Sequence, residues 1–287
     1  MRQIDYNAVV EAVKQACMQA AFELPADVLA ALQAARRTER NARAQRILEQ
    51  LLENARLAAD ERIAMCQDTG LAVAFVELGA EVRIVPPADR PAATLTDAIN
   101  DGIAAGYDEG YLRKSVAAEP LNQRRNTTTN TPAIVHYAVV PGDGLRIALM
   151  AKGGGCENKS QFRMFNPTAS PDEVKDWIVE VVTAAGPNAC PPFVIGVGLG
   201  GNFELSCLLS KKALLRDIGT THAEPYYGQL ETELLAAINA TGLGPQGLGG
   251  DTTALAVHVE TAPCHIASLP VAVNIECHAH RHVHISV

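Results

Sequence analysis

The segment AIVHYAVVPGDGLRIALMA, residues 133–151, decides the fold class of this chain. Residues 133–140 and 145–151 are rich in β-branched and other apolar side chains, which favour strands. Pro141-Gly142-Asp143-Gly144 between them is typical of a turn. The pattern predicts two strands joined as a hairpin.

On the N-terminal side of this segment, the pattern is helical. From residue 4 to about 58, apolar residues recur at helical spacing with charged residues between them. Another helical stretch runs from Thr94 to about Gly106. We therefore expect an N-terminal helical lobe at residues 1–60, packed on an α/β portion at residues 61–287.

On the C-terminal side, helices and strands alternate. Ser170-Pro171-Asp172-Glu173 predicts a helix start with an N-cap, a proline in the first turn and early acids, and Gly186 predicts its end. The remaining patterns predict strands near residues 193–197, 253–260 and 270–277 and helices at 203–215 and 224–241. The fold class is therefore mixed α/β (α+β).

Composition excludes several classes of function. The 287 residues carry a net charge of −8, and the lysines and arginines are scattered, which argues against nucleic acid as a partner. No apolar stretch is long enough for a membrane helix, and the start of the chain lacks the apolar core of a signal peptide. We expect a cytoplasmic protein whose seven cysteines are reduced and serve as core residues or metal ligands.

Three cysteines lie where elements are expected to begin or end. Cys66 is in Met65-Cys66-Gln67-Asp68-Thr69-Gly70, Cys190 precedes Pro191-Pro192, and Cys277 ends the last predicted strand. Loop positions of this kind suit ligands to a shared metal centre. The alternative is three separate buried cysteines, which is the commoner arrangement when only spacing is considered.

Two glycine-rich segments suggest close approach of the backbone to a ligand or a partner chain. Lys152-Gly153-Gly154-Gly155-Cys156 follows a predicted strand and could bring backbone amides to an anion, although a wide turn would have the same composition. Residues 242–250 contain five glycines in nine positions, which is many for a simple connection.

Two further patterns suggest other functions. Residues Gly196–Gly201 match the G-x-G-x-x-G of dinucleotide sites, which leaves an NAD-dependent dehydrogenase as an alternative. However, the run lies late in the chain, and we predict that it lets the following helix pack close to its strand. A strand would place four alternating histidines on one face, where they could bind zinc or nickel or form a solvated edge: His278, His280, His282 and His284.

Six motifs together resemble class I fumarases. They occur in the family's order and approximate spacing, and the resemblance is closest to the alpha subunit of the two-subunit form, in a family that includes L-tartrate dehydratase. The whole chain, residues 1–287, would then be one alpha-type domain. The motifs are CQDTG at Cys66, LRKS at Leu112, KGGG at Lys152, ACPP at Ala189, GPQGLGG at Gly244 and NIECHA at Asn274.

The resemblance implies an iron-sulfur hydro-lyase that hydrates fumarate to (S)-malate, with a tartrate or related hydroxy-dicarboxylate dehydratase as the alternative. It implies a 4Fe-4S cluster held by Cys66, Cys190 and Cys277, which leaves one iron open for catalysis. Cys17, Cys156, Cys207 and Cys264 are expected not to be ligands.

The resemblance also implies the residues that meet the substrate. Asp68 and His265 would be catalytic, and a beta subunit would complete the site in a heterotetramer of two alpha and two beta chains. Two departures leave the substrate open, because Thr128 stands where the family often has glycine and Cys156 where fumarases usually have serine. The substrate-binding residues implied are Gln67, Asp68, Arg113, Thr128, Lys152, Gly153 and Gly154.

Overall fold

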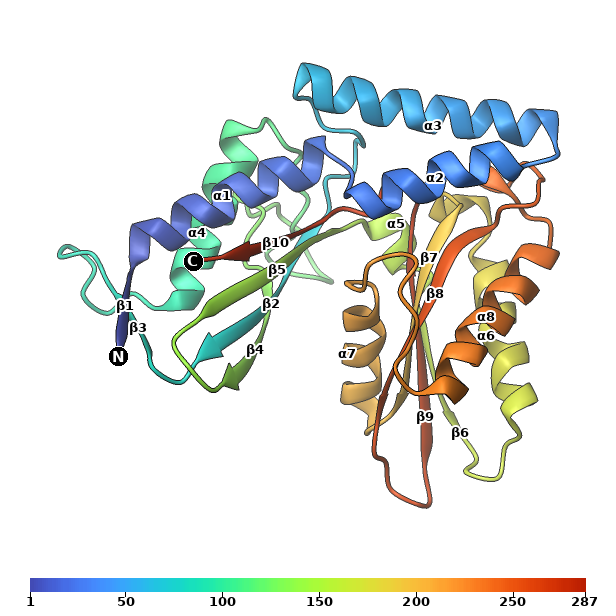
Figure 1. Ribbon diagram of the computed structural model, residues 1–287. Coiled ribbons are helices and arrows are strands. Elements are labelled where there is room, and N and C mark those ends of the chain that lie inside the picture. The colour runs from blue at the N-terminus through green and yellow to red at the C-terminus, as the bar shows by residue number, and fades with distance from the viewer. The chain divides into compact units, whose positions relative to one another are not determined.

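The computed structural model describes residues 1–287 and confirms a mixed α/β fold (Figure 1). The chain divides into two compact units, each built from separate segments of sequence. The first unit contains residues 1–25, 55–153 and 281–287, and the second contains residues 26–54 and 154–280. No helix is both long and apolar enough to cross a membrane.

The first unit contains a four-stranded sheet in the order β10-β5-β2-β4. The predicted hairpin is wrong, because β2 lies between the two strands, parallel to β4 and antiparallel to β5. The turn at residues 141–144 instead passes over the end of β2, where the Gly79 amide donates to the Gly144 carbonyl at 2.8 Å. The strands are β2 (Leu71–Gly79), β4 (Ile134–Val140), β5 (Leu145–Lys152) and β10 (His282–Ser286).

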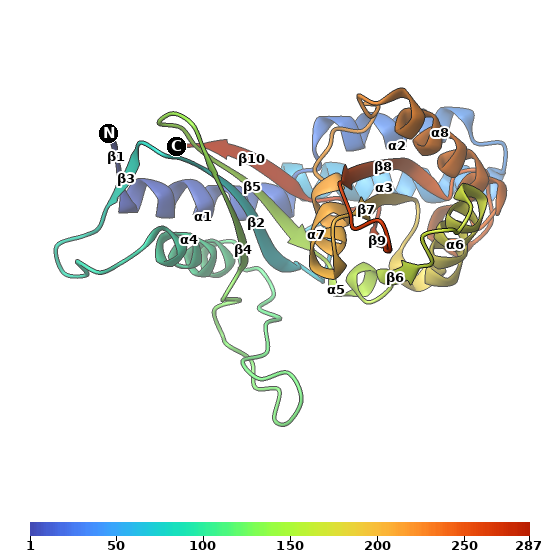
Figure 2. The ribbon, with the colours of Figure 1, turned by 90° about the horizontal axis from the view of Figure 1, so that it is seen from below.

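Helices α1 (Tyr6–Phe22) and α4 (Leu95–Glu109) build the core of the first unit against this sheet. Their close contact depends on Gly102 and Gly106 of α4, where a Cβ atom would meet the backbone of α1 at 2.7 and 2.8 Å. The short strands β1 (Arg2–Asp5) and β3 (Val82–Val85) form a separate parallel pair. Figure 2 shows the long loop after α4 extending beyond the sheet.

The second unit is a sheet in the order β6-β9-β7-β8 with helices on both faces. Helices α6 and α8 cover one face and α7 covers the other (Figures 1 and 2). A capping box between Ser170 and Glu173 begins α6, as predicted. The elements are α5 (Gly154–Glu157), β6 (Gln161–Phe165), α6 (Pro171–Ala185), β7 (Phe193–Gly200), α7 (Phe203–Ala213), α8 (Pro225–Ala240), β8 (Ala254–Ala262) and β9 (Leu269–Glu276).

The N-terminal region is helical, but its helices do not form one unit. Helix α1 belongs to the first unit, whereas α2 (Ala26–Thr38) and the first part of α3 (Ala42–Glu61) belong to the second. In the second unit, the Asp27 carboxylate accepts a hydrogen bond from the Ile218 amide at 2.7 Å, and Arg40 pairs with Asp251 at 2.7 Å. Residues 26–54 thus contact residues far along the chain and belong with them to the second unit. The boundary between the two units therefore does not lie at residue 60, where we expected it.

The run Gly196–Gly201 shows the predicted close packing of helix on strand. Gly196 and Gly198 lie inside β7, and a Cβ atom on either would collide with the Ser210 or Ser206 carbonyl of α7. A dinucleotide fingerprint needs its glycines in the turn between strand and helix. The position of these two glycines within the strand therefore favours a packing role.

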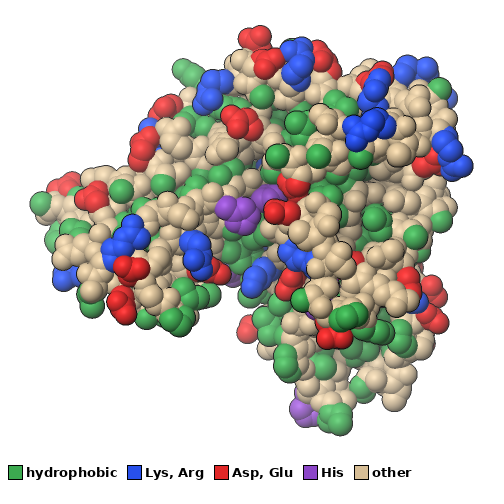
Figure 3. Space-filling view, viewed as in Figure 1, with side chains coloured by type: hydrophobic (Ala, Val, Ile, Leu, Met, Phe, Trp, Pro, Cys, Tyr) green, Lys and Arg blue, Asp and Glu red, His purple; other side chains and the backbone are tan.

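Charged side chains of both signs are interspersed on the face that Figure 3 shows. Charged side chains of the chain also form ion pairs, such as Lys175 with Glu233 at 3.0 Å and Lys211 with Glu157 at 2.7 Å. Positive charge is not gathered into a stripe on that face, which agrees with the scatter in the sequence.

Candidate functional site

The CQDTG motif forms the loop between α3 and β2 in the first unit. The Asp68 carboxylate accepts a hydrogen bond from the Gly70 amide at 3.0 Å, which tightens the turn. Gly70 has φ +83°, and a Cβ atom there would lie 2.6 Å from the Ala151 carbonyl carbon. Only glycine lets this loop approach β5 so closely, and Lys152 pairs with Leu71 at the same point.

Buried hydrogen bonds connect this loop to the loop that carries Arg113. The Thr69 hydroxyl donates to the Arg113 carbonyl at 2.7 Å, and the Tyr107 hydroxyl donates to the Thr69 carbonyl at 2.7 Å. Both side chains are buried. The structure therefore brings the loop of Gln67 and Asp68, the loop of Arg113 and the end of β5 at Lys152 together within one unit.

Two buried residues that the sequence analysis did not single out hold these loops in place. Asn130 accepts from the Ser115 amide at 2.7 Å and donates to the Gly70 carbonyl at 3.1 Å. Arg281 donates to the Asp68 carbonyl at 2.6 Å. Buried amide and guanidinium groups need hydrogen-bond partners, so they often hold loops in place. Which loops Asn130 and Arg281 hold is known only from the fold.

The Arg113 side chain is exposed and forms no ion pair. The nearest acid on each side of it in sequence has other partners. Glu109 pairs with Lys14 at 3.1 Å, and Glu119 accepts backbone hydrogen bonds that hold its pKa at about 2. The guanidinium is thus available for an external carboxylate.

Thr128 and the glycines after Lys152 occupy special backbone positions. Thr128 is exposed with φ +67°, a left-handed conformation that favours glycine. Lys152 is buried at the end of β5. Gly153 is the last residue of this segment of the first unit, and Gly154 begins α5 in the second unit.

Three other motifs converge in the second unit. Cys190 has φ 58° and follows a short 3-10 helix, Pro187–Ala189. Its carbonyl accepts from the His278 amide at 3.3 Å, and the His278 ring nitrogen lies 3.1 Å from the same oxygen. Gln246, from the glycine-rich segment, donates to the Pro191 carbonyl through its amide at 2.8 Å and its side chain at 2.9 Å.

Cys277 directly follows β9 and lies beside a buried carboxylate and another thiol. The Glu276 carboxylate lies 3.3 Å from the Cys156 sulfur and 3.7 Å from the Cys277 sulfur. Cys156 was predicted not to be a ligand, and no local sequence pattern predicts its contact with Glu276. Glu276 was missed altogether, although it stands inside the NIECHA motif.

The cysteines differ in their suitability as iron ligands. Cys66, Cys190 and Cys277 are partly exposed reduced thiols, and soft thiolates of this kind are the usual ligands of iron-sulfur clusters. Cys17 is different, because burial between α1 and α4 raises the pKa of its thiol to about 12. The thiol chemistry therefore fits the predicted ligand set, with Cys66 in the first unit and the other two in the second.

His265 lies at the opposite end of β9 from Cys277. It is exposed in the loop before the strand, where its ring accepts from the Ala267 amide at 3.1 Å. Strands rise about 3.3 Å per residue, so the eight residues of β9 span about 26 Å. The structure does not bring His265 and Cys277 of one chain together.

The four alternating histidines do not share one strand. Only His282 and His284 lie in β10, with ring centroids 5.7 Å apart. His280 is buried, and its ring nitrogen lies 2.7 Å from the Leu214 carbonyl. The expectation of four histidines on one strand face is wrong, because β10 begins only at His282.

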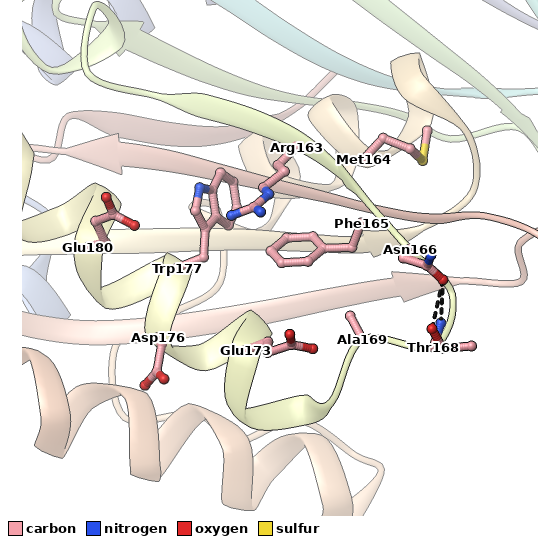
Figure 4. Close-up of a pocket in the computed structure, with 10 residues that line it drawn as sticks. All are labelled: Arg163, Met164, Phe165, Asn166, Thr168, Ala169, Glu173, Asp176, Trp177 and Glu180. Atoms are coloured by element: carbon pink, nitrogen blue, oxygen red, sulfur yellow. Dashed lines mark hydrogen bonds between the residues drawn. The ribbon is translucent and has the colours of Figure 1, made fainter.

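A separate cavity of about 580 Å³ opens between β6 and α6 (Figure 4). Phe165 packs edge-on against Trp177, and the Arg163 guanidinium lies 4.5 Å from the Phe165 ring centre. None of the motif residues lines this cavity.

Comparison with known proteins gives one consistent result. The family model described as fumarate hydratase (Fumerase) matches residues 10–286. The chain is 35% identical to the protein named "Putative L(+)-tartrate dehydratase subunit alpha" of Methanocaldococcus jannaschii, over 95% of both chains. It is 28% identical to the L(+)-tartrate dehydratase subunit alpha of Escherichia coli K12, over 96% of this chain and 89% of that one.

Proposed function

Since this chain belongs to the fumarate hydratase family, we propose that it is the alpha-type subunit of an iron-sulfur hydro-lyase acting on a small dicarboxylate. Fumarate and (S)-malate are the first candidate pair. This proposal rests on one observation. The loop of Asp68, the loop of Arg113 and the end of β5 at Lys152 meet at Thr69 and Gly70. This junction places two cationic side chains and a carboxylate on adjoining segments of one unit.

We propose Cys66, Cys190 and Cys277 as the ligands of a 4Fe-4S cluster. Three thiolates leave one iron without a protein ligand, and such an iron supplies Lewis-acid chemistry toward a hydroxyl group. The thiol set fits because all three are partly exposed, and because Cys190 is held rigidly by its backbone and by His278.

Arg113 would bind one substrate carboxylate through two parallel charge-assisted hydrogen bonds. Lys152, Gly153, Gly154, Gln67 and Thr128 would complete the binding surface on this chain. Asp68 would orient the substrate or move a proton, because its carboxylate is held by the Gly70 amide next to these residues.

His265 would enter the site of a second copy of the chain. The length of β9 separates it from Cys277 of its own chain, whereas its exposed loop is free to reach a neighbour. Mixing two inactive variants tests this assignment. His265→Ala and Cys277→Ser chains should regain part of the activity when they are co-assembled, and no regain would contradict it.

A beta-type subunit would supply the remaining carboxylate contacts and complete a heterotetramer of two alpha and two beta chains. The printed names of the relatives, which call them alpha subunits, support a partner. Hydratase activity should therefore require co-expression with a beta-type chain. Full activity of this chain by itself would contradict the proposal.

Dehydration of L(+)-tartrate is the second candidate reaction. It is favoured by the printed names of the relatives, whereas Thr128 and Cys156, the two departures from the fumarase pattern, leave the substrate open. The anaerobically reconstituted complex should be assayed on fumarate, mesaconate and L(+)-tartrate in parallel. The ratio of kcat/KM values identifies the substrate.

Iron analysis tests the cluster ligands separately from activity. Serine at Cys66, Cys190 or Cys277 should lower the iron content of the anaerobically purified chain, whereas serine at Cys207 or Cys264 should not. Full iron content in any of the first three variants would show that the assignment is wrong.

A further inference from the structure

Cys156, Glu276 and Cys277 form a compact set of metal-binding groups in the second unit. Their donor atoms all lie within 4.8 Å of one another. Cys156 comes from α5, Glu276 is the last residue of β9 and Cys277 directly follows it, so residues 120 positions apart in the chain meet there. Cys156 and Glu276 are buried and Cys277 is partly exposed.

The spacing of these atoms suits a single tetrahedral ion. Zinc binds thiolates at about 2.3 Å and carboxylates at about 2.0 Å, so tetrahedral angles put sulfur and oxygen about 3.5 Å apart and two sulfurs about 3.8 Å apart. The two sulfur–oxygen distances here are 3.3 and 3.7 Å, and the two sulfurs lie within 4.8 Å. Only a small movement of the thiols would complete the geometry.

The donor types also select the ion. Two thiolates and one carboxylate favour zinc or ferrous iron over magnesium or calcium, which prefer oxygen ligands. The site sits on rigid supports, because Glu276 is fully buried and accepts from the Cys277 amide at 3.2 Å. The adjoining Ile275 amide is held by the Ser160 hydroxyl at 3.1 Å.

We propose that Cys156, Glu276 and Cys277 bind one thiophilic divalent ion, zinc or ferrous iron, when the chain carries no cluster. This site differs from the proposed cluster set, because it uses Cys156 and Glu276 and does not use Cys66 or Cys190. The two sites share Cys277, so on the proposed function an ion held here and the cluster exclude each other.

Cobalt titration of the full chain tests the site. The chain is stripped of metal with a chelator under anaerobic conditions and titrated with Co²⁺, a spectroscopic stand-in for zinc. The wild-type chain should show a thiolate charge-transfer band and intense tetrahedral bands that saturate at about one ion per chain, and zinc should displace them. No saturable thiolate band in the wild type would overturn the proposal.

Matched variants identify the ligands. Cys156→Ser and Glu276→Gln should each weaken Co²⁺ binding at least tenfold, whereas Cys207→Ser, Cys66→Ser and Cys190→Ser should bind as the wild type does. Near-UV circular dichroism of the metal-free variants identifies any that fail to fold. If either Cys156→Ser or Glu276→Gln fails to fold, the other variant still tests the site. Wild-type binding by a folded Cys156→Ser or Glu276→Gln chain would overturn the assignment, as would loss of binding on changing Cys66 or Cys190.

The titration is read on the cluster-free chain and needs no substrate or beta subunit. Its result is therefore independent of the hydro-lyase assay. Loss of hydratase activity in every reconstituted complex would contradict the proposed function and leave this metal site unaffected.

Discussion

The exposed guanidinium of Arg113 has no protein carboxylate as a partner and is proposed to bind a substrate carboxylate. Its removal should therefore lower kcat/KM strongly. A charge-assisted hydrogen bond contributes on the order of 1.5 to 3 kcal/mol, so Arg113→Ala should lower kcat/KM by roughly ten- to a hundredfold. Arg113→Lys keeps the charge but loses the two-bond geometry, and should also lower it. The measurement is steady-state kinetics of the reconstituted complex, with iron content unchanged.

Arg125→Ala is the matched control for this prediction, because Arg125 is also exposed and lies in the same loop. It should keep kcat/KM within about twofold, as expected for a surface position. If Arg113→Ala behaves like Arg125→Ala, the guanidinium of Arg113 does not bind substrate.

Substitution of Thr128 by glycine should stabilise the folded chain. A side chain with a Cβ atom in a left-handed conformation is destabilising by about 1 kcal/mol, and Thr128 has φ +67°. Thr128→Gly should raise the free energy of unfolding by about 0.5 to 1 kcal/mol relative to Thr128→Ala, which loses the same hydroxyl but keeps the Cβ atom. Urea denaturation of both variants measures the difference, and equal stability would show that the strain is relieved elsewhere.

The close packing of α7 on β7 predicts that adding a methyl group to a glycine of this strand destabilises the fold. A methyl group at Gly198 would collide with the Ser206 carbonyl and push α7 from the sheet. Gly198→Ala should therefore lower the free energy of unfolding by about 1 to 3 kcal/mol or more. Gly144→Ala is the control, since no atom lies within 4 Å of a Cβ there and its change should stay within about 0.5 kcal/mol.

Helices with local start and stop signals were predictable from sequence, and strands with distant partners were only partly so. The capping box at Ser170 is a local signal, and α6 begins there as predicted. The apolar stretch of β2 inserts between β4 and β5, and no local pattern reveals that insertion. The contact between Cys156 and Glu276 was missed for the same reason, because it depends on how α5 meets β9.

The stability of the folded chain should depend on pH through His258. Burial, followed by the nearby Arg216 charge, lowers the pKa of this histidine from 6.5 to about 4. Between these values the unfolded chain binds a proton that the folded chain does not, so stability falls as the pH decreases from about 6.5 to about 4. The loss should be on the order of 3 kcal/mol.

Urea denaturation between these pH values measures this effect. His258→Gln removes the titrating group, so its stability should change less steeply with pH over the same range than that of the wild type. Equal slopes for the two chains would show that other groups cause the acid sensitivity.

The last seven residues belong to the first unit, and they complete it late in synthesis. Residues 281–287 add β10 to the sheet beside β5, and Arg281 holds the Asp68 carbonyl of the CQDTG loop. A ribosome makes these residues only after it has made residues 154–280 of the second unit. The loop that carries Cys66 therefore cannot gain its Arg281 contact until the whole second unit has been synthesised, so the first unit is the last of the two to be completed.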